Sequence, residues 1–185
     1  MLVFEADRKI QVSQDDISAL IAAAQKDPAA FSRLYDCYVQ PIYRYVFSRV
    51  GTVHEAEDIT SQTFMSAYES LGRYRERGQF SAWLFRIARS KMNDHFRRSK
   101  REVGFEAAGE ILEREDALGV LIRAEEVSRI RFIISHLNEE EQELIRLRYV
   151  AELSFVEIAD LLGRREDAVK KSVYRLLARL KSQLE

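Results

Sequence analysis

Arginine and aromatic side chains alternate along one stretch of this chain, a pattern that could bind both the phosphates and the bases of a nucleic acid. Cations alone suffice for the phosphates of a duplex, whereas aromatic rings add platforms on which unpaired bases stack, worth about 1–3 kcal/mol per base. The loop at residues 72–79 could also wrap a base extruded from a duplex. The pattern therefore indicates single-strand binding, and it consists of Arg73, Tyr74, Arg75, Arg77, Phe80, Trp83, Phe85, Arg86 and Arg89.

The helix expected after this loop cannot expose all of its aromatic rings, so part of the stretch must belong to a core. The apolar spacing predicts that Leu84, Ile87 and Ala88 are buried. Trp83 fits the core and the surface equally well, and both interpretations stay open. We expect a polar face that consists of Arg86, Arg89, Ser90 and Asn93.

A second basic stretch, at residues 162–181, has the features of a helix-turn-helix that reads duplex DNA. A capping box of Ser154 and Glu157 begins a short helix, and Gly163 supplies the left-handed residue of the turn. A longer helix follows, which fits the major groove, where lysine and arginine reach guanine acceptors and phosphates. An ordinary amphipathic hairpin is the alternative, but it does not require a basic exposed face. We expect that face to carry Lys170, Lys171, Tyr174 and Arg175.

Helices are the elements that must position both stretches. Hydrophobic residues make up 46% of the chain and charged residues 32%, which allows a packed core. With only 7 Gly and 2 Pro, the chain has too few turn formers for a β-rich fold. The apolar spacing predicts helices from Ser13, from Pro28 with a restart or kink at Pro41, over residues 54–71, and from Ser81 as a cap to residue 98.

The net charge of −1 hides a strong segregation of charge along the chain. Residues 73–101 hold ten basic and two acidic side chains, and residues 102–128 hold eight acidic and two basic ones. Taken alone, each basic block could be a solvated helix face. Because the helical periodicity fades in the acidic stretch, which also contains three glycines, we expect a flexible linker there that avoids a polyanion.

We therefore expect an all-α protein with two small helical domains joined by a flexible acidic linker. The predicted parts are an N-terminal extension with a first helix at residues 1–24, a first domain at 25–100, the linker at 101–124 and a second domain at 125–185. A capping box of Asn138 and Glu141 begins a helix of the second domain.

The sequence contains few features that are typical of an enzyme's catalytic site. His54 and Asp58 have the spacing of half a metal-binding helix, but the second histidine of that motif is absent. Phosphate-loop and nucleophile-elbow sequences are absent too, and the single cysteine, Cys37, excludes an internal disulfide and multi-cysteine zinc sites. We expect no catalysis, no cofactor, no metal and no small-molecule substrate. The charged first ten residues and the short apolar run at 19–24 predict a cytoplasmic protein that does not insert into a membrane.

Several segments together resemble the extracytoplasmic-function sigma factors, the smallest class of the main bacterial sigma family. Residues 56–64 (AEDITSQTF) resemble its A-E-D…T-F stretch, and residues 80–89 (FSAWLFRIAR) resemble its F-x-x-W-L-x-R-I-A segment. Residues 94–98 (DHFRR) resemble the D-x-x-R-R at the end of the same domain. The stretch at 137–141 (LNEEE) and the later helix-turn-helix resemble the C-terminal domain.

This resemblance implies a division of labour between the two domains. The first, sigma region 2, would bind the β′ clamp helices of core RNA polymerase and melt the minus-ten promoter element. The second, sigma region 4, would bind the β flap and read the minus-thirty-five element, while the acidic linker threads toward the RNA exit path. The family also implies an anti-sigma partner, which could hold the cytoplasmic protein at the membrane.

The resemblance also assigns residues to these surfaces. Glu57, Asp58 and Gln62 would face polymerase. Together with the alternating pattern, it gives a single-strand site of Tyr74, Arg75, Arg77, Phe80, Trp83, Arg86, Arg89, Ser90 and Asn93. The duplex site would consist of Arg165, Lys170, Lys171, Tyr174 and Arg175.

Two positions depart from the family pattern. Ser90 stands where the family often has asparagine, so its shorter reach bears on base preference. Arg165 stands at the cap of the reading helix, where a lost cap costs roughly 1 kcal/mol that Asp167 could partly offset.

A free-standing helical repressor is the rival interpretation of the function, and it would bind promoter duplex tightly without polymerase.

Overall fold

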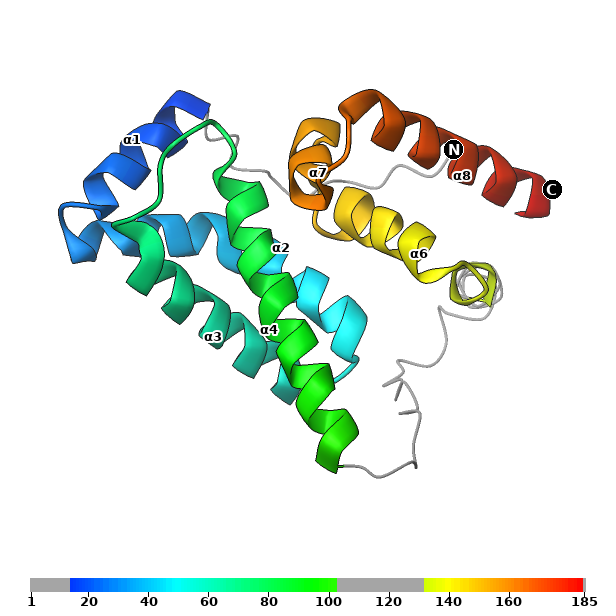
Figure 1. The fold of residues 1–185 in the computed structure, drawn as a ribbon, viewed down its shortest axis with the longest axis horizontal. Coiled ribbons are helices and arrows are strands. Elements are labelled where there is room, and N and C mark those ends of the chain that lie inside the picture. The colour runs from blue at the N-terminus through cyan, green and yellow to red at the C-terminus, as the bar shows by residue number, and fades with distance from the viewer. Residues whose placement is uncertain (1–13, 103–131, 185) are drawn as a thin grey trace, which may run out of the picture.

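The computed structural model describes residues 14–102 and 132–184, and every regular element in these two ranges is helical (Figure 1). The N-terminal part contains α1 (Gln14–Ala24), a 3-10 turn η1 (Pro28–Ala30), α2 (Phe31–Val50), α3 (Val53–Leu71) and α4 (Phe80–Glu102). The C-terminal part contains a helical turn at residues 132–135, α6 (Glu139–Ile145), a π-helical segment η2 (Arg146–Val150), α7 (Phe155–Leu162) and α8 (Glu166–Leu184). The all-α prediction is confirmed.

The first domain is a bundle in which α2 packs against α1, α3 and α4. Local signals fix its boundaries: Thr52 accepts a hydrogen bond from the Glu55 amide at the start of α3, and Gly51 ends α2 in the left-handed conformation at φ 80°. Helix α1 also belongs to the bundle, because Ile17 and Ile21 are buried in the common core. The first helix is therefore packed against the domain that was expected to follow it.

Two details of the helices differ from the sequence predictions. Pro41 does not restart the chain but lies inside a continuous α2. Packing offsets the cost of a proline within a helix, about 3 kcal/mol, since Leu34 before it and Ile42 and Tyr45 after it are buried. Ser81 does not cap α4, which begins one residue earlier; its hydroxyl donates instead to Glu157 of α7.

In the second domain, α7 packs against α8 and α6 contacts η2. Both predicted capping boxes are present: Asn138 and Ser154 each accept from the amide three residues on, and Glu141 and Glu157 accept in return. Gly163 ends α7 with φ 64°. The helix-turn-helix predicted from these signals is thus formed.

The two domains pack against each other along α4 and α7 and along α2 and η2 (Figure 1). One continuous core results, in which the rings of Tyr45 and Phe85 lie 5.2 Å apart next to Leu144 and Leu147 of the second domain. The predicted linker at 101–124 lies almost wholly outside the described residues, as do residues 1–13 of the extension. Of the helices in the described ranges, none combines the length and hydropathy needed to cross a membrane.

Candidate nucleic-acid interface

The loop between α3 and α4 and the first turn of α4 carry the aromatic half of the predicted single-strand site. The rings of Tyr74, Phe80 and Trp83 form one cluster, with centroid distances of 4.7 Å from Tyr74 to Trp83, 5.5 Å from Tyr74 to Phe80 and 5.2 Å from Phe80 to Trp83. Tyr74 and Trp83 are half-buried, so each offers part of its ring to a ligand. Burial, and then the Glu76 carboxylate, raise the pKa of Tyr74 to about 12, which keeps its hydroxyl neutral.

Phe80 has a different place from the one the sequence predicted. The residue is only 2% exposed, and its ring also contacts the ring of Tyr38, at 5.3 Å between centroids. A ring enclosed in this way cannot stack on a base in this arrangement. The structure gives Phe80 a supporting role beneath Tyr74 and Trp83.

Gln25, which directly follows α1, holds the loop between α3 and α4 by two hydrogen bonds. Its side-chain amide donates to the backbone oxygens of Leu71 at 3.0 Å and of Tyr74 at 2.8 Å. No local sequence pattern connects Gln25 with this loop, because the contact joins residues far apart in the chain. The loop therefore has a defined shape, and its arginines project from a fixed base.

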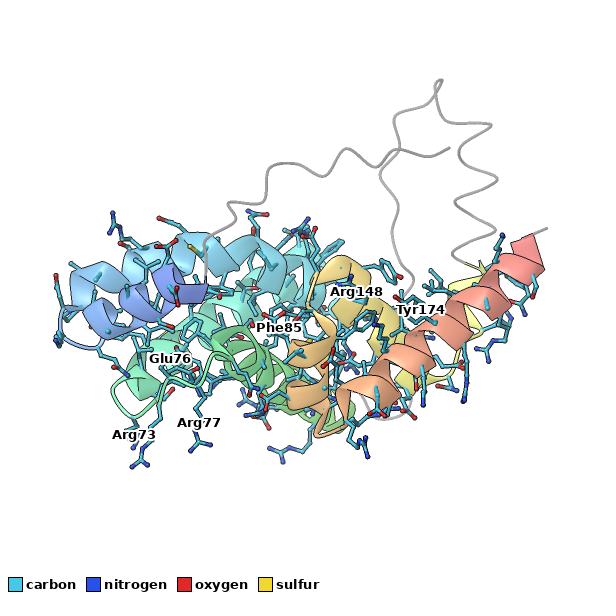
Figure 2. The ribbon with its side chains drawn as sticks, turned by 90° about the horizontal axis from the view of Figure 1, so that it is seen from above. Arg73, Glu76, Arg77, Phe85, Arg148 and Tyr174 are labelled. Carbon is cyan, nitrogen blue, oxygen red and sulfur yellow. The ribbon has the colours of Figure 1, made fainter. Side chains whose placement is uncertain are left out.

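The cations of the loop are free to meet phosphates. Arg73, Arg75 and Arg77 are exposed, and Figure 2 shows Arg73 and Arg77 projecting away from the helices. The backbone turns sharply at Gly78, with φ 74°, and the Gly78 amide donates to the Glu76 carboxylate. This turn places the three arginines beside the aromatic cluster, as single-strand binding requires.

The polar face of α4 continues the site along the helix. Arg86, Ser90 and Asn93 are exposed and Arg89 is half-buried, as the spacing predicted. Leu84 and Ala88 are buried in the core, and Ile87 packs partly against it. Arg86 and Arg89 are not unpartnered, however. The Arg86 guanidinium lies 3.0 Å from Asp160, and that of Arg89 lies 3.2 Å from Glu143.

The predicted duplex site lies on α8. All five of its residues are exposed: Arg165, Lys170, Lys171, Tyr174 and Arg175. Arg165 precedes the helix and donates to both carboxylate oxygens of Asp167, at 3.1 and 3.3 Å. This pair holds the Arg165 guanidinium beside the first turn of α8.

A stack of side chains that the sequence analysis missed supports this surface. Arg148 lies over the ring of Phe155, 4.8 Å from its centroid, and the Phe155 ring lies 5.9 Å from that of Tyr174. Arg148 also donates to the backbone oxygen of Leu153 at 2.8 Å. Figure 2 labels Arg148 and Tyr174, the two ends of this series of contacts, which runs through Phe155. The Arg148 cation thus holds the Phe155 ring, and that ring supports Tyr174 from one side.

A third surface lies on α3. Glu57, Asp58 and Gln62 are exposed there, with the Asp58 carboxylate 3.8 Å from the imidazole of His54. Beside them a groove of about 560 Å³ runs between α2 and α3. It was missed from the sequence, although aromatic residues at i and i+4 marked it, and it is lined by Phe31, Tyr35, Val39, Gln40, Tyr43, Glu57, Thr60, Ser61, Phe64, Met65 and Tyr68.

Two of the histidines form ion pairs that do not involve each other. Within residues 14–102 and 132–184, which the structure describes, no three His, Cys, Asp or Glu side chains come together as a metal site. His54 contacts Asp58, and His95 instead lies 3.1 Å from Glu55. Burial raises the pKa of the Cys37 thiol, with Asp36 as a smaller cause, which disfavours the nucleophilic thiolate.

Comparison with known proteins matches both domains. Residues 34–102 match the family described as Sigma-70 region 2, and residues 128–180 match Sigma-70, region 4. The chain is 38% identical over 170 residues to the ECF RNA polymerase sigma factor BldN of Streptomyces coelicolor. That alignment covers 87% of this chain and 63% of the relative.

A second relative is matched over nearly its whole length. The chain is 32% identical over 169 residues to the ECF RNA polymerase sigma factor SigW of Bacillus subtilis, covering 85% of this chain and 90% of SigW. Among solved structures, CnrH in complex with the cytosolic domain of CnrY is similar, with a TM-score of 0.62 and 25% identity. That match covers 93% of this chain and 97% of the CnrH chain.

Proposed function

This chain belongs to the sigma-70 family, in its extracytoplasmic-function group of RNA polymerase sigma factors, and we propose that its two domains act on the promoter at two separate places. One observation carries the proposal. A single chain presents an aromatic and arginine surface suited to single strands and, on another domain, an exposed basic helix suited to duplex. A protein that melts DNA at one point while holding duplex at another needs both.

The first domain is proposed to melt and hold the minus-ten element. Unpaired bases would stack against Tyr74 and Trp83, whose rings are held in place by Phe80. Their phosphates would be bound by Arg75 and Arg77 of the loop and by the face of α4 that carries Arg86, Arg89, Ser90 and Asn93. Because Ser90 is short, its contact with a base would be weaker than that of an asparagine.

The second domain is proposed to read the minus-thirty-five element with α8. Lys170, Lys171 and Arg175 are exposed on this helix and can reach phosphates and guanine acceptors in the major groove. Tyr174, held by the stack on Phe155, offers an apolar edge and a hydroxyl to the same groove. Arg165 would bind a phosphate at the start of the helix.

Core RNA polymerase is the proposed partner of both domains. Glu57, Asp58 and Gln62 on α3 would contact the β′ clamp helices, and the second domain would contact the β flap. The exposed Met65 and Tyr68 support this placement, because they extend the polar patch of α3 with apolar area. Catalysis of RNA synthesis would belong to polymerase, with this chain contributing no catalytic group and no cofactor.

An anti-sigma factor is the proposed regulator. CnrH, which is similar in fold and sequence, was solved with the cytosolic domain of CnrY. This supports a protein partner for the present chain, and it supports a site of action in the cytoplasm. The type of anti-sigma factor would decide whether the complex is held at a membrane.

Run-off transcription tests the function directly. Purified core polymerase would be mixed with the chain and a library of promoters, and transcripts would be mapped. We expect defined start sites only when the chain is present, and fewer transcripts with Asp58→Ala than with Asp36→Ala, which removes an exposed carboxylate from α2 instead. Unchanged initiation on all promoters, together with nanomolar duplex binding by the chain alone, would favour a repressor.

A further inference from the structure

Gln25 lies where the end of α1 meets the loop of the single-strand site. Its backbone amide donates to the backbone oxygen of Ile21 at 2.9 Å, so the residue continues the last turn of the helix. That turn is anchored, because Ile21 and Ala24 are buried in the core of the first domain. The side chain of Gln25 therefore projects from a base that close packing holds in place.

The side-chain amide of Gln25 reaches both ends of one turn. The Tyr74 backbone amide donates to the Leu71 oxygen at 3.0 Å, which closes the turn that follows α3. Gln25 donates to the oxygen of Leu71 at 3.0 Å and to that of Tyr74 at 2.8 Å, so one nitrogen bridges the first and the last residue of the turn. An amide nitrogen carries two hydrogens, one for each of these oxygens. We call this pair of hydrogen bonds the Gln25 brace.

The two ends of the braced turn differ in how firmly their side chains are held. Leu71 is buried in the core, whereas Tyr74 is half-buried and has its ring 4.7 Å from that of Trp83 and 5.5 Å from that of Phe80. Ring contacts alone would leave Tyr74 some freedom, since aromatic pairs are favourable over centroid distances of about 4.5–7 Å. The Gln25 brace holds the peptide group of Tyr74 itself, and so it restricts where the ring can lie.

We propose that Gln25 is a positioning residue of the single-strand site, because it sets the place of Tyr74 and thereby the surface that Tyr74 and Trp83 offer to an unpaired base. This inference rests on the proposed function and adds a determinant from outside the loop and α4. Gln25 itself would not contact the base. The end of α1 would thus contribute to the reading of the minus-ten element as well as to the core.

The brace should act on the fraction of molecules whose loop is ready to bind. When only a fraction has the competent loop, the apparent dissociation constant is the intrinsic constant divided by that fraction. Without the brace, the Tyr74 carbonyl would bond to water, and its ring would leave Trp83 part of the time. Single-strand affinity should therefore fall. Duplex binding by α8 should be unchanged, because that helix belongs to the other domain.

The test uses full-length variants in which the side chain at position 25 keeps its size. Gln25→Met also keeps the charge but removes the donors, and Gln25→Glu replaces the donor nitrogen with an oxygen that accepts only. The same substitutions at Gln40, which is exposed on α2, are the matched controls. Trp83 is the single tryptophan of the chain, so its fluorescence reports on the aromatic cluster without a label. The DNA probes are a short random-sequence single strand and a random-sequence duplex.

Both Gln25 variants should expose Trp83, which would move its emission to longer wavelength and increase its quenching by acrylamide. Gln25→Met should bind the single strand about two- to tenfold more weakly, the effect of one lost hydrogen bond, and should bind duplex with wild-type affinity. Gln25→Glu is compared with Gln40→Glu, because an added negative charge weakens binding to any nucleic acid. The Gln40 variants should keep wild-type fluorescence.

Three results would overturn the proposal. Unchanged emission and quenching in Gln25→Met would mean that Tyr74 keeps its place without the brace. Changed fluorescence with unchanged single-strand affinity would mean that the place of Tyr74 does not matter for binding. A lower stability in urea, with native fluorescence and the ratio of single-strand to duplex affinity both unchanged, would show that Gln25 is merely structural. Because Gln25 is exposed, neither substitution should prevent folding, which circular dichroism checks.

The run-off assay separates failure of this inference from failure of the proposed function. If the wild-type chain directs no initiation while the Gln25 variants behave as expected, the promoter function fails and the positioning role in single-strand binding stands. If the wild-type chain directs initiation and the Gln25 variants match the Gln40 variants in fluorescence and in single-strand affinity, only the positioning role fails.

Discussion

Trp83 is the residue on which the single-strand site depends most. It lies half-buried between Tyr74 and Phe80, so that part of its indole is held by the protein and part is available to a base. The sequence left this residue between core and surface. The structure gives it an intermediate place, since Trp83 packs against the core and against two aromatic rings but is not fully buried.

Replacing this ring should impair promoter melting more than duplex binding. Loss of one stacking partner costs about 1–3 kcal/mol, so Trp83→Ala should reduce open complexes by roughly 5- to 150-fold. Permanganate footprinting with core polymerase measures unpaired thymines, and gel shift measures duplex binding. Trp83→Phe should restore most of the footprint, because phenylalanine keeps a stacking face. An equal loss in both assays for Trp83→Ala would instead indicate damage to the fold.

Local spacing identified the polar residues of the site better than its aromatic ones. Arg86, Ser90 and Asn93 recur on one side of a helix, and their exposure followed from that alone. Phe80 could not be placed in this way, because Tyr38 of α2 and Tyr74 of the loop enclose it. Contacts between separate elements decide such cases, and the sequence does not contain them in any local pattern.

At the scale of the element, the turn of the helix-turn-helix depends on backbone conformation at Gly163. This residue has φ 64°, and a Cβ added there would find nothing within 4 Å. Space is therefore available, and the cost of a side chain lies in the left-handed conformation alone. Gly72 offers a matched comparison, because it also has room for a Cβ but has φ −60°.

Gly163→Ala should destabilise the protein by about 1–2 kcal/mol, the usual cost of a left-handed alanine. Gly72→Ala should be neutral or stabilising by up to about 1 kcal/mol, since it lowers the entropy of the unfolded chain. Urea unfolding followed by circular dichroism gives both free energies. Equal stabilities of the two variants would mean that the turn relaxes without a left-handed residue.

Helix ends were predicted more accurately than helix interiors. The boxes at Asn138 and Ser154 are local patterns of side chain and amide, and both are formed. The continuity of α2 through Pro41 depends on packing from α1, α3 and α4, which no local signal reports. The π-helical segment η2 was likewise not predicted.

At the scale of the whole molecule, the basic surfaces of α4 and α8 differ in how accessible their cations are to DNA. The sequence predicted two domains on a flexible tether, and it gave no sign that Glu143 would contact Tyr45, 98 positions away in the chain. That contact partly covers the cations of α4. The cations of α8 are exposed in the same arrangement, so we expect them to bind duplex without any change in the contact between the domains.

Binding of the isolated chain to promoter duplex should accordingly be weak and depend steeply on salt. The four cations of the duplex site are Arg165, Lys170, Lys171 and Arg175. If each neutralises one phosphate, the logarithm of the binding constant should fall with the logarithm of salt concentration with a slope of roughly −3 to −4. Fluorescence anisotropy over a salt series measures this slope.

Lys171→Ala tests which cations produce that slope. The variant should bind more weakly and reduce the slope by about 1, because one counterion fewer is released. Lys181→Ala removes the same charge from the last turn of α8 and should leave the slope unchanged, since Lys181 lies beyond the reading surface. If both substitutions changed the slope equally, DNA would be attracted to the whole basic helix, and the assignment of one face of α8 to the major groove would be wrong.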